Sequence, residues 1–164
     1  MAKAVIFDLD GTLIRLPIDY GKLLKEFSEI METNNVRPLT EKISKLNDKT
    51  RKNIFEVWDR FELAALKDVT VNEEGISLYK KFHKIPRALV TMQGKALVQI
   101  VTNRFELSFS VVITREDSLD RVVQLQIAVQ KFKTQSKDVL FVGNTEEDNR
   151  AAKKIGCQFL RVKE

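Results

Sequence analysis

Two carboxylates separated by one residue, Asp8 and Asp10, stand where the first apolar segment of the chain gives way to a turn. That segment is typical of a buried strand in a parallel sheet, and Gly11 permits the turn. Placed together, one carboxylate can attack a phosphorus atom while the other carries a proton. Buried like charges are costly unless a cation neutralises them, so the pair also indicates a hard ion such as Mg²⁺. Alone, the pattern Asp-x-Asp-Gly could equally be an acidic turn.

Alternating apolar and amphipathic segments predict the elements that must position these carboxylates. The strands are expected at residues 3–9, 87–92, 110–114, 139–143 and 158–162. The helices between them are expected at residues 72–84, 94–103, 119–133 and 146–155. This alternation predicts an α/β fold with an open five-stranded parallel sheet covered on both faces.

Polar side chains gather at the carboxyl ends of the predicted strands. Besides the two aspartates they are Thr91, Thr114, Arg115 and residues 144–148. Because parallel sheets bind ligands beyond these ends, near the point where the strand order reverses, we expect these side chains to share one site.

Residues 16–70 interrupt the alternation with helical spacing and no convincing strand. Helices are expected at 18–32, 41–47 and 50–66. Their large apolar side chains are expected to pack a small core or to cover the site, and include Phe27, Phe55, Trp58, Phe61 and Leu63. We therefore expect residues 1–15 and 71–164 to form the α/β core and 16–70 a helical insertion.

The motifs and their order resemble the haloacid dehalogenase (HAD) superfamily, in particular its phosphoglycolate-phosphatase-like members with a helical cap after the first motif. Residues 7–13 (FDLDGTL) are similar to its first motif and residues 89–91 (LVT) to its second. Residues 142–148 (VGNTEED), with the Ala-Ala and Gly that follow, are similar to its fourth. The resemblance implies a Rossmann-like α/β core, with residues 16–70 as an all-helical cap that selects substrate.

The same resemblance implies roles for individual residues. Asp8 would be the nucleophile that forms an aspartyl-phosphate, and Asp10 the general acid and base. Thr91, with the backbone near Met92, would hold the phosphoryl oxygens. The ligands of Mg²⁺ would be Asp8, Asp10, Asn144 and Asp148.

Two positions depart from the family pattern. The third motif should supply a Lys, but residues 114–124 contain none, so Arg121 is the best substitute and Arg115 the second. Asn144 stands where a metal-binding Asp is expected, and it brings no negative charge, which weakens Mg²⁺ binding. Glu146 or Glu147 could compensate, although either is as readily explained as a carboxylate at a helix N-terminus.

The expected function is a Mg²⁺-dependent phosphatase that hydrolyses a small phosphorylated metabolite. The alternative is a catalytically weakened relative that binds a phosphorylated ligand or a protein partner. Asp10 argues against metal-free dehalogenation, whereas phosphotransfer to an acceptor other than water stays open. Arg15, Tyr20 and Arg60 are candidates for substrate contact.

Composition sets the remaining expectations. The formal charge of +5 comes from dispersed Lys and Arg, so an anionic small substrate is favoured over nucleic acid. One Cys and one His give no zinc cluster. No apolar run suits a membrane span or a secretory signal, so a cytoplasmic protein is expected. Nothing in the sequence indicates an oligomeric state.

Overall fold

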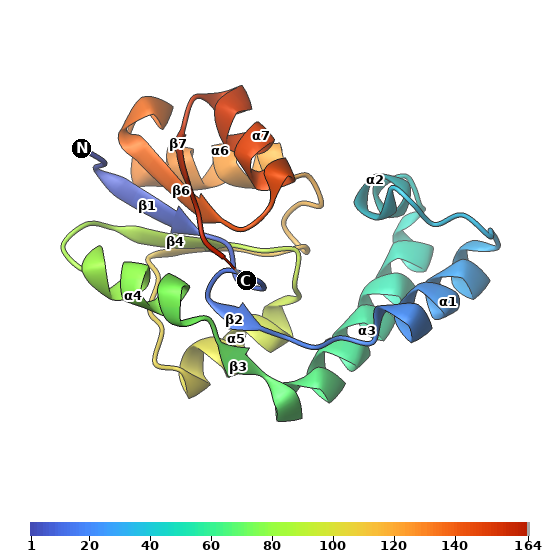
Figure 1. Ribbon diagram of the computed structural model, residues 1–164. Helices are drawn as coiled ribbons and strands as arrows, with labels where there is room; N and C mark the ends of the chain where they lie inside the picture. The colour runs from blue at the N-terminus through green and yellow to red at the C-terminus, as the bar shows by residue number, and fades with distance from the viewer. Residues whose placement is uncertain (164) are drawn as a thin grey trace.

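A central sheet of five parallel strands organises the computed structural model, which describes residues 1–163 (Figure 1). The strands are β1 (Ala4–Phe7), β4 (Arg87–Val90), β5 (Val111–Ile113), β6 (Val139–Gly143) and β7 (Gln158–Arg161), in the order β5-β4-β1-β6-β7. The chain builds outward from β1 on one side and then crosses to β6 on the other. The strand order therefore reverses at β1, which is where such sheets bind ligands.

Helices cover both faces of the sheet because successive strand residues point to opposite sides. On one face, Ala4 and Ile6 of β1 pack with residues of α6 (Arg121–Phe132) and α7 (Glu146–Ile155). On the other, Val5 and Phe7 pack with residues of α4 (Glu73–Lys81) and α5 (Lys95–Arg104). The predicted α/β architecture is confirmed. Within residues 1–163, no helix is both long and apolar enough to cross a membrane.

The helical insertion after the first strand contains α1 (Tyr20–Met31), α2 (Leu39–Ser44) and α3 (Asp48–Ala65), which extend away from the sheet in Figure 1. Short 3-10 helices follow α3 at Leu66–Asp68 and precede β6 at Ser136–Asp138. The insertion enters and leaves through two short antiparallel strands, β2 (Ile14–Arg15) and β3 (Thr70–Val71). The expectation that this region holds no strand was wrong at Thr70, because two-residue strands are too short to show alternation in a sequence.

The apolar side chains of the insertion form part of one continuous core with the sheet. Phe27 and Trp58 are buried and meet edge to face at 5.7 Å between α1 and α3. Phe55 and Phe61 pack against the same core. Leu63 is the exception, since it is 40% exposed.

Candidate active site

Asp8 directly follows the central strand β1 and lies beside the carboxyl end of β6. Its backbone N–H donates to Val142 O at 3.0 Å, and its side chain is almost fully buried. Asn144 follows β6, and the hydroxyl of Thr12 lies 3.2 Å from Asn144 Oδ1 and 3.5 Å from Asp8 Oδ2. Gly11 makes this return of the chain possible with a φ of 84°. Asp8 and Asn144 are thus brought together across two neighbouring strands.

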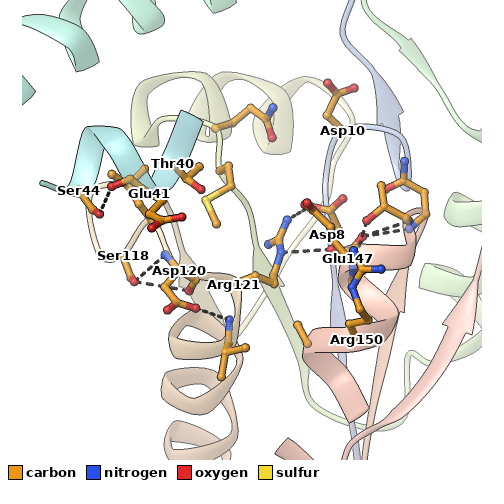
Figure 2. A pocket seen from close by; sticks show the side chains of 18 of the residues that line it. Asp8, Asp10, Thr40, Glu41, Ser44, Ser118, Asp120, Arg121, Glu147 and Arg150 are labelled. Carbon is orange, nitrogen blue, oxygen red and sulfur yellow. Dashed lines mark hydrogen bonds and ion pairs between the residues drawn. The ribbon is translucent and has the colours of Figure 1, made fainter. Parts of the chain in front are cut away.

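Asp10 lies further along the same loop and lines the same cavity as Asp8. Its Oδ1 accepts a hydrogen bond from the Leu16 N–H at 3.0 Å, at the point where the chain leaves for the insertion. Figure 2 shows the Asp10 side chain set apart from that of Asp8. The two carboxylates therefore occupy different parts of one cavity, which suits a division of labour between them.

Arg121, the first residue of α6, bridges two carboxylates of the site (Figure 2). Its Nη2 lies 3.1 Å from Asp8 Oδ1, and its Nε lies 3.2 Å from Asp148 Oδ1. Nη1 donates to Gln124 Oε1 at 2.9 Å, which fixes the plane of the guanidinium. Asp120 caps the helix by accepting from the Val122 N–H at 2.9 Å. The cation of the site therefore comes from α6.

Arg115, the second candidate for this cation, lies elsewhere. Its side chain is fully buried and pairs with Asp59 and Glu62 of α3 instead of Asp8. The sequence could not separate the two arginines, because both follow β5 within a few residues of each other.

The pKa of Asp8 is raised from 3.8 to about 7, chiefly because burial disfavours its charged form. Arg121 opposes this rise in pKa, while the nearby carboxylates of Asp148 and Asp10 add to it. A cation bound at this carboxylate would favour its ionised form.

Asp148 organises the turn after β6. It forms a capping box with Thr145 at the start of α7, and its Oδ2 accepts from the Asn144 N–H at 3.2 Å. A Cβ on Gly143 would stand 2.7 Å from that same oxygen, so only glycine fits there. Arg121 engages the other oxygen of Asp148, so the Asp148 carboxylate contacts both Arg121 and the backbone of Asn144.

Thr91 directly follows β4 and is fully buried, and its hydroxyl bonds within its own loop. It accepts from the Gln93 N–H at 3.0 Å and donates to the Gln93 side chain. Met92 and Gln93, but not Thr91, line the cavity beside Asp8. Gln124, which sequence reasoning missed, donates to Thr91 O at 2.9 Å and ties this loop to α6.

The cavity has a volume of about 1030 Å³ and is lined by the loops at the carboxyl ends of the strands, α6, α7 and the insertion. The insertion contributes Tyr20, Thr40, Glu41 and Ser44, and α7 contributes Glu147, Arg150, Ala151 and Lys154. Of the three candidates for substrate contact, only Tyr20 lines it. Arg15 donates to Val71 O at 3.2 Å, and Arg60 pairs with Glu26 on the insertion surface.

The side chains of Asp8, Asp10 and Asn144, which could bind a metal ion at the cavity, offer oxygen atoms. Among residues 1–163, no three His, Cys, Asp or Glu side chains form a metal-binding group. Asn144 Oδ1 is a further oxygen at this cavity, 3.2 Å from the Thr12 hydroxyl, which also lies 3.5 Å from Asp8 Oδ2. Two carboxylates and an amide oxygen fit a hard cation in chemical type, with one negative charge fewer than three aspartates would bring.

An aspartate-centred site at the switch point of a parallel sheet, with a helical insertion after the first strand, defines a HAD-like α/β fold. The sequence model of the haloacid dehalogenase-like hydrolase family matches residues 5–162, so this chain belongs to that family. A comparison of the sequence with curated proteins finds no match.

Solved structures with the same fold cover nearly the whole chain. A predicted phosphoglycolate phosphatase from Haemophilus somnus is 20% identical, with a TM-score of 0.67 over 98% of this chain and 84% of that one. CbbY from Rhodobacter sphaeroides, in complex with phosphate, is 15% identical, with a TM-score of 0.68 over 100% and 87%. A HAD family enzyme from Bacteroides thetaiotaomicron, an aspartate-to-alanine mutant in complex with magnesium and inorganic phosphate, is 15% identical, with a TM-score of 0.60 over 99% and 95%.

Proposed function

We propose that this HAD-like hydrolase is a Mg²⁺-dependent phosphatase that hydrolyses a small phosphorylated metabolite through an aspartyl-phosphate at Asp8. The observation that carries the proposal is the buried Asp8 carboxylate at the cavity wall, paired with Arg121 at 3.1 Å. A nucleophile, a fixed cation and a second carboxylate at one cavity are the groups that phosphoryl transfer requires.

In the first step of the proposed reaction, an oxygen of Asp8 attacks phosphorus, and the bond from phosphorus to the leaving oxygen breaks. Asp10 donates a proton to that leaving oxygen. Water then attacks the aspartyl-phosphate, Asp10 takes the water's proton, and phosphate departs as Asp8 is regenerated. The Leu16 N–H holds one oxygen of Asp10 throughout, which keeps the acid and base in place.

Charge control in this reaction falls to Arg121 and to a bound cation. Arg121 neutralises the negative charge that builds up on the phosphoryl oxygens and keeps Asp8 directed at the cavity. Mg²⁺, held by Asp8, Asp10 and Asn144, would keep Asp8 ionised and neutralise the phosphoryl group. Asp148 would contribute by orienting Asn144. Backbone N–H groups near Met92 would bind the phosphoryl oxygens.

Residues 16–70 would act as a cap on a core formed by residues 1–15 and 71–164. Support comes from the side chains that the insertion adds to the cavity wall, namely Tyr20, Thr40, Glu41 and Ser44. They lie beyond the reacting aspartates, so they would contact the part of the substrate that differs between metabolites. The phosphate and magnesium complexes of the structural neighbours support the same class of substrate for this chain.

Asn144 favours a second candidate function, in which this chain binds a phosphorylated ligand and turns it over only slowly. Its amide oxygen accepts from Thr12 and brings no charge to the metal site. Affinity for a divalent cation falls as ligand charge is removed. Turnover in the presence of millimolar Mg²⁺ separates the two functions.

The test is hydrolysis of p-nitrophenyl phosphate by the purified chain with Mg²⁺ and with EDTA, beside the variant Asp8→Asn. Asp68→Asn is the matched control, because Asp68 is exposed on the insertion side of β3. We expect Mg²⁺-dependent turnover that Asp68→Asn keeps and Asp8→Asn loses by at least about 1000-fold. Turnover retained in Asp8→Asn would rule out the proposed nucleophile.

A further inference from the structure

A buried group of charges joins the insertion to the sheet, and we call Arg115, Asp59 and Glu62 the Arg115 cluster. Arg115 follows β5, and its Nη1 lies 2.7 Å from Glu62 Oε2 of α3, while Nη2 pairs with Asp59. Arg115 and Glu62 have fully buried side chains. The guanidinium also lies over the Trp58 ring, 4.4 Å from its centre. Removing these charges from water is costly, so each must stay within reach of its partners.

The same cluster holds three consecutive backbone groups of the loop after β4. Arg115 Nη1 donates to Met92 O at 3.2 Å, and the Arg115 backbone N–H donates to Gln93 O at 3.3 Å. The Gly94 N–H donates to Glu62 Oε1 at 3.1 Å. Arg115 follows strand β5, whereas Glu62 belongs to α3 of the insertion. The loop after β4 is therefore held between the α/β core and the insertion.

Gly94 shows how closely the loop and the cluster fit. A Cβ at this position would stand 2.3 Å from Asp59 Oδ1 and 2.6 Å from Arg115 Nη2. A side chain here would have to displace the ion pair between Asp59 and Arg115. Met92 and Gln93, the two residues before it, line the cavity that contains Asp8.

We infer that Glu62 and Arg115 are positioning residues, which hold loop 92–94 in the shape that binds phosphate only while α3 is docked on the α/β core. The assignment of phosphate to this loop rests on the proposed function. The physical link is direct, because displacement of α3 removes the acceptor of the Gly94 N–H and the main partners of Arg115 together. The insertion thereby controls the shape of the phosphate loop as well as the outer wall of the cavity.

The experiment compares Glu62→Ala with Glu62→Gln, which keeps an oxygen acceptor for Gly94 but removes the charge that faces Arg115. Amide hydrogen exchange by NMR reports on the Gly94 N–H, and calorimetry with inorganic phosphate and Mg²⁺ reports on the loop's affinity. We expect Glu62→Ala to speed Gly94 exchange about tenfold and to weaken phosphate binding about tenfold. In Glu62→Gln, the protection of the Gly94 N–H from exchange and the affinity for phosphate should both be partly restored relative to Glu62→Ala.

The Asp8 N–H, bonded to Val142 O in the sheet, is the internal reference, and Glu56→Gln on the exposed side of α3 is the control variant. Exchange that rises equally at Asp8 and Gly94 would mean general destabilisation and would overturn the inference. So would unchanged Gly94 exchange in a folded Glu62 variant. If Glu62→Ala does not fold, the Gln variant decides. Absence of phosphate binding by the unmodified chain would refute the proposed function, while Gly94 exchange still tests the positioning role.

Discussion

At the scale of single residues, Asn144 sets the charge of the site. Its backbone N–H is held by Asp148 and its side-chain oxygen accepts from Thr12, so the residue is built into the loop after β6. An aspartate at this position would keep that backbone contact and add one charge next to Asp8. The added charge would attract a divalent cation and, without one, repel the neighbouring carboxylates.

We therefore expect Asn144→Asp to lower the Mg²⁺ concentration for half-maximal turnover by about tenfold. The same variant should unfold at a lower temperature than the unmodified chain in EDTA and recover in Mg²⁺. Activity titrations and thermal melts measure the two effects. A Mg²⁺ dependence identical to that of the unmodified chain would exclude Asn144 from the metal site.

At the scale of elements, the loop after β1 keeps its shape because the start of α4 packs directly on it. Asn72 caps α4 by accepting from the Glu74 N–H at 3.2 Å, and its Nδ2 donates to Gly11 O, also at 3.2 Å. Gly75 lets the helix approach, since a Cβ there would stand 1.7 Å from Thr12 O. The loop after β1 and α4 therefore form one packed unit.

Gly75→Ala tests this packing, because helix propensity predicts a gain in stability whereas steric overlap predicts a loss. Propensity alone would stabilise α4 by about 1 kcal/mol, but the overlap with Thr12 should lower the free energy of unfolding by about 3 kcal/mol. Gly21→Ala in α1 is the matched control, since its Cβ would meet only Asp19 Oδ1 at 3.5 Å. Urea denaturation should show a lower free energy of unfolding for Gly75→Ala and no decrease for Gly21→Ala. Equal stabilities would contradict the close contact.

At the scale of the whole molecule, burial raises the pKa of three carboxyl groups in the folded chain. Burial raises the pKa of Asp8 to about 7, and it also raises the pKa values of Asp59 and Glu62 although Arg115 opposes it. A carboxyl with a raised pKa binds its proton more tightly in the folded state than in the unfolded state. Its contribution to stability is therefore present at low pH and is lost as the pH rises through the folded pKa.

For Asp8 this window runs from 3.8 to about 7. In EDTA, we expect the unmodified chain to lose on the order of 2–4 kcal/mol of unfolding free energy across it, relative to Asp8→Asn. The comparison with this variant cancels the parts due to Asp59 and Glu62. Mg²⁺ should restore stability mainly at the upper end, where Asp8 is ionised. The free energy of unfolding is measured by chemical denaturation at each pH. If it changes with pH in the same way for the unmodified chain and for Asp8→Asn, the raised pKa of Asp8 is contradicted.

The sequence by itself determined the parallel α/β architecture, because helix and strand periodicity depend on neighbours a few residues apart. The five core strands and seven α-helices all lie within a few residues of their expected positions in the described chain. It also identified the residues at the ends of β1, β4 and β6, because the order of the strands brings those ends together.

Only the tertiary structure decided which side chains meet. Arg121 and not Arg115 reaches Asp8, although the pair is 113 residues apart in the chain, and Arg115 instead meets Glu62, 53 residues away. The short β2–β3 pair and the exposure of Leu63 were likewise invisible in the sequence. Contacts of this kind depend on how the insertion docks on the sheet, and no local pattern records that geometry.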